Sequence, residues 1–206
     1  MNIRRIATAF TAAAVLAAAS TAGASAPFKR YTLAVGATTQ IVTPVKLTVL
    51  LPTAWKVAPP DPVARDLASK ALSWSASVRL EQKGTTLADL RRHEITDFPR
   101  PEINGWRDIW GWEAGRYRVV GDTYVTLKIG KAWRETLLVV PGTKSTGWAA
   151  RRYMRTYLVH RGVAHDALTG VEKELFISFD AACTPAECPA ANPQFATIMR
   201  SIRFIP

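Results

Sequence analysis

The chain lacks the motifs on which many enzyme classes depend. Its 206 residues include only three histidines and two cysteines, and no G-x-S-x-G nucleophile elbow, S-x-x-K pair or glycine-rich phosphate loop occurs. After residue 24 it also lacks any run of about 18 apolar residues, the length of a transmembrane helix. These absences argue against hydrolases of those types, P-loop enzymes and helical membrane proteins. We expect no cofactor and no bound metal.

Residues 1–24 predict a secretory signal peptide. Arg4 and Arg5 form a positive start, and the apolar stretch that follows is too short and too rich in alanine to span a bilayer stably. Ala22-Gly23-Ala24 supplies the small residues that signal peptidase accepts, so we expect cleavage after Ala24. The mature chain, residues 25–206, has the usual size of a single domain and is expected in a periplasm or outside the cell.

Acidic residues are scarce. Loss of Arg4 and Arg5 with the leader leaves 25 basic against 16 acidic residues, a formal charge of +9. Such a charge favours an anionic partner, although it also keeps an exported protein soluble. Nucleic acid is not expected as that partner, because export separates the chain from it.

The two cysteines, Cys183 and Cys188, lie in a stretch of small residues and prolines where a turn is expected. In an oxidising compartment they are predicted to form a disulfide. A redox dithiol or a metal pair is the alternative, but the spacing is C-x4-C and no histidine lies nearby in the sequence.

Several segments alternate between apolar and polar residues, which is the pattern of strands with one buried face. The connections are too short for helical crossovers, so the sheet is predicted to be antiparallel. Residues 116–120, 134–140 and 152–161 are further strand candidates. The alternating apolar residues are Leu47, Val49 and Leu51; Trp74, Ala76, Val78 and Leu80; Val125, Leu127 and Ile129; and Leu175, Ile177 and Phe179.

Three helices are predicted. Thr86 and Asp89 form a T-x-x-D cap for a helix that ends before Pro99. Asn192 is expected to cap a C-terminal helix, in which Phe195, Ile198, Met199 and Ile202 share one face. A weaker third helix is predicted for residues 62–72, with Asp61 as its cap.

Three segments resemble the PsbP-like family of exported proteins. KLTVLLPTAWKV (46–57) resembles its opening strand, RYMRTYLVHRGVAHDAL (152–168) its paired central strands, and FATIMRSIRF (195–204) its last helix and short final strand. The resemblance covers residues 46–206 and implies an α+β fold, an α/β/α sandwich with a central antiparallel sheet. It also implies a family of diverse and mostly non-catalytic accessory proteins, without a shared active-site residue.

The segment WRDIWGWEAGRYR (106–118) interleaves tryptophans with arginines. Aromatic faces stack on sugars, and guanidinium groups hold phosphate or carboxylate, so the segment is a candidate site for an anionic ligand. A core role for the tryptophans is the alternative reading. The candidate binding residues here are Trp106, Arg107, Trp110, Trp112, Arg116 and Arg118.

A second basic region, residues 136–165, contains no acidic residue. If it forms a strand, Arg155 and Arg161 share a face with Tyr153 and Tyr157, and Arg151 lies just before it. Arg151 and Arg155 are therefore added to the candidate binding residues. A solvated sheet edge protected by arginines is the alternative.

The histidines offer a weaker, catalytic reading. His93, Glu94 and Asp97 form H-E-x-x-D, in which aspartate replaces the second histidine that a zinc protease motif requires. His160 and Asp166 are the other acid–base candidates. A small periplasmic hydrolase built on either set is thus the alternative function. The leading hypothesis is an exported, non-enzymatic binding protein that recognises an anionic protein, glycan or lipid headgroup, such as an immunity or adaptor protein.

Overall fold

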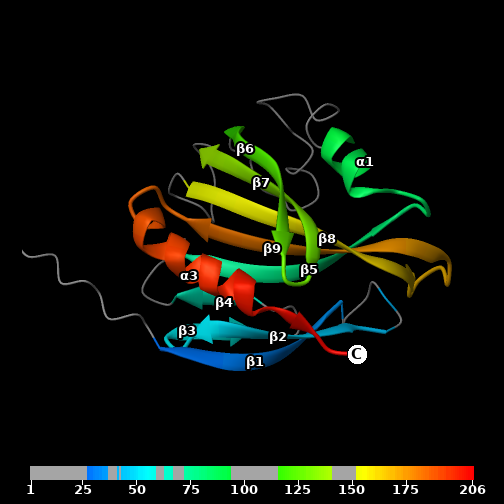
Figure 1. Ribbon diagram of the computed structural model, residues 1–206, viewed down its shortest axis with the longest axis horizontal. Coiled ribbons are helices and arrows are strands. Elements are labelled where there is room, and N and C mark those ends of the chain that lie inside the picture. Colours follow the sequence, from blue (N-terminus) through cyan, green and yellow to red (C-terminus); the bar gives the residue numbers. More distant parts are fainter. Residues whose placement is uncertain are drawn as a thin grey trace, which may run out of the picture.

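Two antiparallel sheets form the body of the protein in a computed structural model, which describes residues 27–36, 41, 43–58, 63–66, 72–93, 116–140 and 152–206. The smaller sheet has the order β1 (Phe28–Val35), β2 (Val45–Pro52) and β10 (Arg203–Phe204). The larger sheet has the order β3-β4-β5-β9-β8-β7-β6 (Figure 1). Its strands are β3 (Trp55–Ala58), β4 (Val63–Asp66), β5 (Ser73–Glu81), β6 (Arg116–Leu127), β7 (Gly130–Val140), β8 (Arg152–His165) and β9 (Glu172–Cys183).

The alternating apolar residues of β5 and β9 lie on one face of the larger sheet, as predicted, whereas Leu47, Val49 and Leu51 lie on β2 of the smaller sheet and Ile129 lies in the turn after β6. Ala76 pairs with Phe179 and Val78 with Ile177 across β5 and β9, and all four side chains are buried. Trp74 stacks on Phe179 with ring centroids 6.2 Å apart. Burial of one face is what fixes the register, because a slip by one residue would turn these side chains to solvent.

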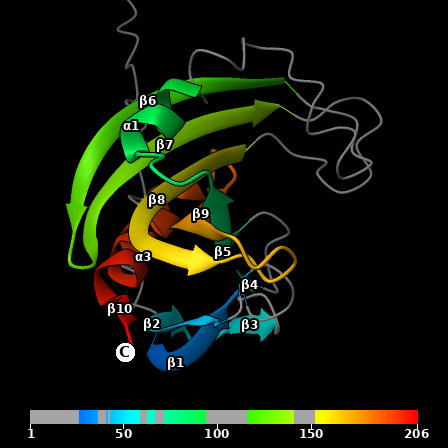
Figure 2. The same ribbon diagram turned by 90° about the vertical axis from the view of Figure 1, so that its right-hand side faces the viewer.

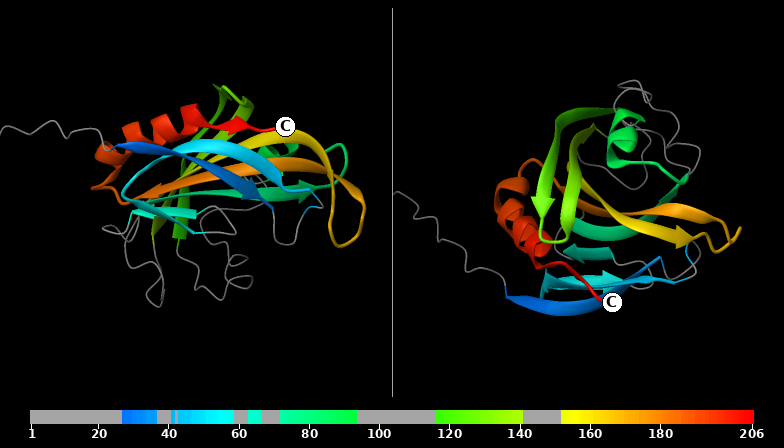
Figure 3. Two further views of the ribbon diagram at one scale, coloured as in Figure 1. Left: turned by 90° about the horizontal axis from the view of Figure 1, so that it is seen from below. Right: turned by 45° about the vertical axis from the view of Figure 1, so that its right-hand side comes forward.

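Helix α3 (Cys188–Ser201) joins the two sheets. It contacts β2 and β9, and its predicted apolar face is buried: Phe195, Ile198, Met199 and Ile202 are each at most 3% exposed. Together with Leu47, Val49 and Leu51 of β2 they form the main core. Figure 3 shows α3 running along the sandwich and leading into β10.

The opposite face of the larger sheet is covered by the short helix α1 (Leu87–Arg92). Leu90 packs there on Trp133, Leu158 and Phe176, which form a second, smaller core. The strands β6 and β7 curve around this side (Figure 2). Helices therefore lie on both faces of an antiparallel sheet, which confirms the predicted α+β sandwich and adds a small second sheet to it.

The predicted third helix, residues 62–72, is wrong at its start. Val63–Asp66 form β4, which pairs with β3 on one side and β5 on the other. The backbone of β4 forms its hydrogen bonds with two other strands, so the helix signals within residues 62–72 did not reveal that this segment is a strand. Among the described residues, no helix is both long and apolar enough to cross a membrane.

The beginning of the C-terminal helix was also predicted wrongly. The helix starts at Cys188 instead of after Asn192, so Pro193 lies inside it. A proline there removes one backbone hydrogen bond. The early start is held by the predicted Cys183–Cys188 disulfide, which is formed, and by Glu187, whose carboxylate accepts hydrogen bonds from the Thr184 backbone N–H at 3.0 Å and hydroxyl at 2.7 Å.

Candidate functional site

Most of the predicted tryptophan–arginine surface cannot be placed in the fold. Trp106, Arg107, Trp110, Trp112 and Arg151 lie outside the described residues. The backbone of β6 includes Arg116 as its first residue and Arg118 as its third. The proposed use of this segment in binding therefore stays a prediction.

Arg155 lies on β8, an interior strand that pairs with β7 on one side and β9 on the other. The reading of this segment as a solvated sheet edge is therefore wrong. Tyr157, on the same face, is only 8% exposed and belongs to the main core. The Arg155 guanidinium donates a 3.3 Å hydrogen bond to Oδ1 of Asn192 on α3. The helix thus covers this face, and Arg155 lies where strand and helix meet.

Arg161 is separated from Arg155 by an irregularity in β8. The pairing register with β9 shifts between His160 and Val163, and Gly162 there has a φ of 88°. The Arg161 guanidinium lies 3.9 Å from the centre of the Phe204 ring, which places this cation beside β10. The basic and aromatic face predicted for residues 153–161 is therefore split into two parts.

Arg152, which the sequence did not single out, is the buried charged residue of the described part of the chain, at 5% exposure. Burial lowers the pKa of Arg152 to about 10, so its guanidinium keeps its charge at neutral pH. Arg152 is therefore not part of an exposed basic surface.

An open cleft of about 360 Å³ lies between the start of α1 and the larger sheet. Tyr124 forms part of its floor, with Nζ of Lys131 4.5 Å and Cζ of Arg91 5.6 Å from the ring centre. Its lining residues are Gly84, Thr85, Thr86, Leu87, Ala88, Tyr124, Lys131, His160 and Glu174.

The histidine of this cleft, His160, is paired with Glu174, which was not among the residues predicted from the sequence. Nε2 of His160 lies 2.7 Å from Oε2 of Glu174, and the other oxygen of Glu174 accepts the Gly84 N–H at 2.8 Å. Both donors hold the pKa of Glu174 below its usual range, the Gly84 N–H most strongly. His160 and Glu174 therefore form an acid–base pair of the kind that orients an imidazole.

The predicted pairing of His160 with Asp166 is not formed. Asp166 lies in the β8–β9 turn, where Oδ1 accepts the backbone N–H groups of Leu168 and Thr169 and Oδ2 lies 3.2 Å from Nζ of Lys173. These contacts keep its pKa low and use both of its oxygens. The hydrolase hypothesis that paired His160 with Asp166 is therefore not supported, because Asp166 does not contact His160.

The other catalytic set is placed only in part. His93 forms the C-cap of α1, while Glu94 and Asp97 lie outside the described residues. A hydroxyl near the cleft, that of Thr86, is engaged with Asp89 in the predicted capping box, with Thr86 N to Asp89 Oδ2 at 3.0 Å. Within the described ranges, no three His, Cys, Asp or Glu side chains are grouped as metal ligands would be.

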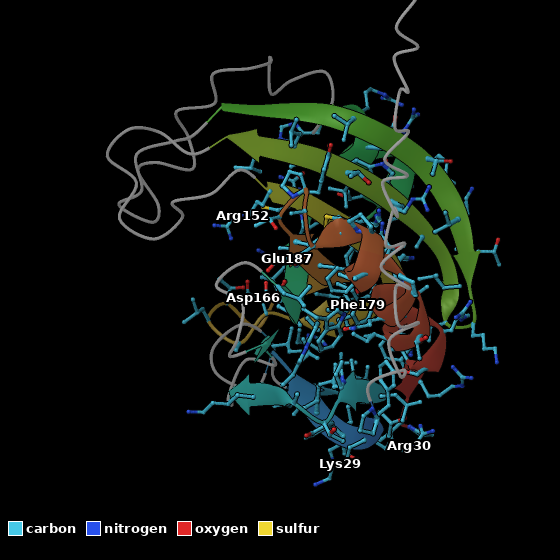
Figure 4. The ribbon with its side chains drawn as sticks, turned by 90° about the vertical axis from the view of Figure 1, so that its left-hand side faces the viewer. Lys29, Arg30, Arg152, Asp166, Phe179 and Glu187 are labelled. Carbon is cyan, nitrogen blue, oxygen red and sulfur yellow. A yellow bond between two sulfur atoms is a disulfide. The ribbon has the colours of Figure 1, made fainter. Side chains whose placement is uncertain are left out.

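A group of exposed cations lies on the smaller sheet. Its outward surface carries three exposed cations, Arg30 on β1, Lys46 on β2 and Arg203 on β10. Arg200 is exposed on the last turn of α3, and Nη1 of Arg203 donates to the Arg200 carbonyl at 3.0 Å. We refer to Arg30, Lys46, Arg200 and Arg203 as the basic face. Figure 4 shows Arg30 and its neighbour Lys29 projecting away from β1.

No carboxylate in the described part of the chain forms an ion pair with the basic face. Residues 28–58 and 188–206, which contribute its strands and helix, contain no aspartate or glutamate at all. Several ion pairs of the described residues lie elsewhere, on β5, on α1 with β6, and on the β8–β9 hairpin. They are Arg79–Glu81, Lys83–Glu172, Arg91–Asp122, Arg92–Asp89, His160–Glu174 and Lys173–Asp166.

The sequence does contain a signal for this face. Acidic residues are absent from residues 28–58 and 188–206, as they are from residues 136–165. What the sequence did not reveal is that β10 pairs with β2, with Arg203 opposite Thr48, and so brings the two segments of this face into one surface.

The layers, the strand order and the C-terminal helix followed by a short strand define an α+β sandwich of the PsbP-like type. Among solved structures it is similar to the solution structure of cyanobacterial PsbP (CyanoP) from Synechocystis sp. PCC 6803, with a TM-score of 0.51, 14% sequence identity, and coverage of 89% of this chain and 96% of that one. The crystal structure of LpqN, involved in cell envelope biogenesis of Mycobacterium tuberculosis, matches with a TM-score of 0.49 and 12% identity over 87% of this chain and 92% of that one.

No protein-family model and no curated protein matches the sequence. The similarity to CyanoP confirms the PsbP-like fold that the sequence motifs predicted. At this level of identity it defines the fold alone.

Proposed function

We propose that this chain is an exported, non-enzymatic binding protein of the bacterial envelope, whose basic face holds an anionic partner. The observation that carries the proposal is the separation of charge. The described carboxylates in ion pairs are found on β5, α1, β6 and the β8–β9 hairpin, whereas Arg30, Lys46 and Arg203 on the smaller sheet face none. A surface of one sign attracts and orients a partner of the other.

The arrangement of the cations fits an extended partner. Arg30 lies opposite Leu50, Arg203 lies opposite Thr48, and Lys46 is two residues further along β2, so the charges occupy three successive rows of the sheet. Neighbouring strands are about 4.8 Å apart, and successive rows on one face of the sheet are about 7 Å apart, so the cations are spread over a broad surface. An acidic protein surface or an anionic envelope polymer can meet all of them at once, whereas one small anion cannot.

The setting supports this assignment. The predicted signal peptide directs the chain out of the cytoplasm, and the Cys183–Cys188 disulfide suits an oxidising compartment. The PsbP-like resemblance implies a mostly non-catalytic family. An immunity or adaptor role, in which the protein blocks or positions an exported partner, follows from these features as part of the proposal.

A pull-down from an envelope extract with the mature protein tests the proposal. Two double variants with the same change in charge are compared: Arg30→Glu with Lys46→Glu on the basic face, and Arg92→Glu with Lys83→Glu, two cations near α1 that pair with Asp89 and Glu172. All four side chains are exposed. We expect the first variant to reduce the retained protein, glycan or lipid at least tenfold and the second to retain it. Raising the salt concentration is expected to weaken retention as well, because exposed charges are screened.

Equal retention by both double variants would contradict binding through the basic face. Retention of nothing by the wild-type chain would contradict the binding function itself.

A further inference from the structure

The β8–β9 hairpin extends beyond the rest of the molecule. It is the yellow and orange pair of strands that projects from the body in Figure 1 and in both views of Figure 3. Its two strands, Arg152–His165 and Glu172–Cys183, are the two central strands of the larger sheet near the core. The tip is therefore attached to two interior strands, each paired on both sides.

The turn at the tip is braced by its own polar groups. Asp166 Oδ1 accepts the N–H groups of Leu168 at 2.8 Å and Thr169 at 3.0 Å. The Gly170 N–H donates to the Asp166 carbonyl at 2.8 Å, and the Asp166 N–H donates to the Val171 carbonyl at 3.0 Å. A turn with this many internal hydrogen bonds holds one conformation before any partner arrives, which lowers the entropy cost of binding.

The braced turn presents apolar side chains to solvent. Leu168 is 88% exposed and Val171 57% exposed, the two highest values among the large hydrophobic residues of the described chain. The base of the hairpin is different, because Leu175 and Ile177 of β9 are buried in the core. Val163, on β8 of the same hairpin, is 50% exposed, so three of the five exposed large hydrophobic residues of the described chain gather here, and a cluster of this kind marks a candidate contact site.

The lysines around the tip are paired with carboxylates. Lys173 pairs with Asp166 at 3.2 Å and Lys83 with Glu172 at 2.5 Å, and Glu174 is a further carboxylate, beside His160. Such a tip has little attraction for an anionic membrane, and two apolar side chains bury too little surface to hold the protein on lipid. An apolar centre with a polar, internally paired rim is instead the usual composition of a protein–protein contact.

We propose that the β8–β9 tip docks on a folded protein partner, which receives Leu168, with Val171 beside it, in an apolar pocket. This contact is separate from the basic face. Leu168 supplies the anchor, and the Asp166 turn supplies its fixed direction.

The test places a photo-crosslinking amino acid at position 168 of the full chain in its native host. A matched probe goes to Lys128, which is exposed in the β6–β7 turn, another hairpin turn. We expect a discrete protein adduct from position 168, none at that mass from position 128, and loss of the adduct when Val171→Asp is added. The partner is then purified and titrated with the mature protein. We expect Leu168→Asp to weaken its binding at least tenfold, while Lys128→Asp leaves it unchanged.

Four results would overturn the proposal: a lipid adduct, an adduct with the mass of a second copy, the same adduct from both positions, or no adduct. Both variants replace solvent-exposed side chains, and an unchanged unfolding temperature shows that they remain folded. The Arg30→Glu, Lys46→Glu variant should keep the position-168 adduct. Failure of the tip contact is therefore distinguishable from failure of the basic face.

Discussion

Nε2 of His160 on β8 lies 2.7 Å from Oε2 of Glu174 on β9, across the irregular part of their pairing. The Gly84 N–H binds the other oxygen of Glu174 at 2.8 Å and so ties the turn before α1 to the hairpin. One carboxylate therefore connects the cleft, the start of α1 and the base of the projecting hairpin. Its protonation state is expected to affect the stability of all three.

The first prediction concerns the acid stability that Glu174 provides. Hydrogen bonds from Gly84 and His160 depress the pKa of Glu174 in the folded state below its ordinary value of 4.5. Its contribution is thus complete above that value and disappears as the pH falls through the folded-state pKa. We expect Glu174→Gln to unfold at lower urea concentration than wild type at pH 7, and the difference to shrink below about pH 4. A difference that stays constant with pH would contradict this role.

The second prediction concerns Asp122, which binds Arg91 of α1 and Trp133 of the smaller core. Its carboxylate accepts from the Arg91 guanidinium, at 2.6 Å for the Nη2–Oδ2 contact, and from Nε1 of Trp133 at 2.8 Å. Trp133 is only 3% exposed, so Asp122→Ala leaves a buried indole N–H without its acceptor. We expect a loss of about 1–3 kcal/mol in the free energy of unfolding, measured by urea denaturation.

The matched control for Asp122 is Glu172→Ala, which breaks the exposed pair with Lys83. Exposed ion pairs contribute less than about 1 kcal/mol, so this variant is expected to remain close to wild type. Asp122→Asn keeps an acceptor for Trp133 and should fall between the two. Equal losses from the alanine variants would mean that the indole hydrogen bond adds no stability.

The local parts of this fold were predictable from the sequence. The alternation at residues 74–80 and 175–179 identified two strands with one buried face, and the Thr86–Asp89 pair identified the start of α1. Both signals involve residues within a few positions of one another. The strand β4 was misread because its pairing with β3 and β5 depends on tertiary contacts that override weak local helix signals.

The candidate sites were less predictable, because they too depend on tertiary contacts. Arg155 was correctly placed on a strand, but its contact with Asn192 depends on how α3 lies across β8. Arg30 and Arg203 are far apart in the sequence and lie on one sheet only because β1 and β10 flank β2. The partner of His160 is Glu174 instead of Asp166, which is nearer in the sequence, because β8 pairs His160 with Phe176 of β9 and Glu174 is two residues from Phe176 on that strand.

The third prediction concerns Gly36, where β1 ends. Its φ is +80°, and a Cβ atom there would lie 2.7 Å from Cγ2 of Val78 and 2.9 Å from Cγ1 of Ile41. Gly84 has a similar φ of +89° but no atom within 4 Å of the same position. Gly84→Ala is therefore expected to cost about 1–2 kcal/mol from backbone strain alone. Gly36→Ala should cost a further 1–3 kcal/mol, roughly, because the core is overpacked.

Thermal and urea unfolding of the two glycine variants give the comparison. The difference between them isolates the contact of Gly36 with Val78 and Ile41, because the two glycines have similar φ angles. Equal losses would show that Val78 and Ile41 move aside without cost, and would contradict close packing of the smaller sheet on the larger one.

The fourth prediction concerns the Cys183–Cys188 disulfide, which links the end of β9 to the first residue of α3. Closing so short a loop contributes roughly 2 kcal/mol on the chain-entropy model. We expect the double variant Cys183→Ala, Cys188→Ala to lose about that much stability. Amide exchange should rise mainly over residues 188–192, because Pro193 lacks the N–H that would hold the first turn. Uniformly faster exchange along α3 would instead mean that the disulfide stabilises the whole helix and that Pro193 does not divide it.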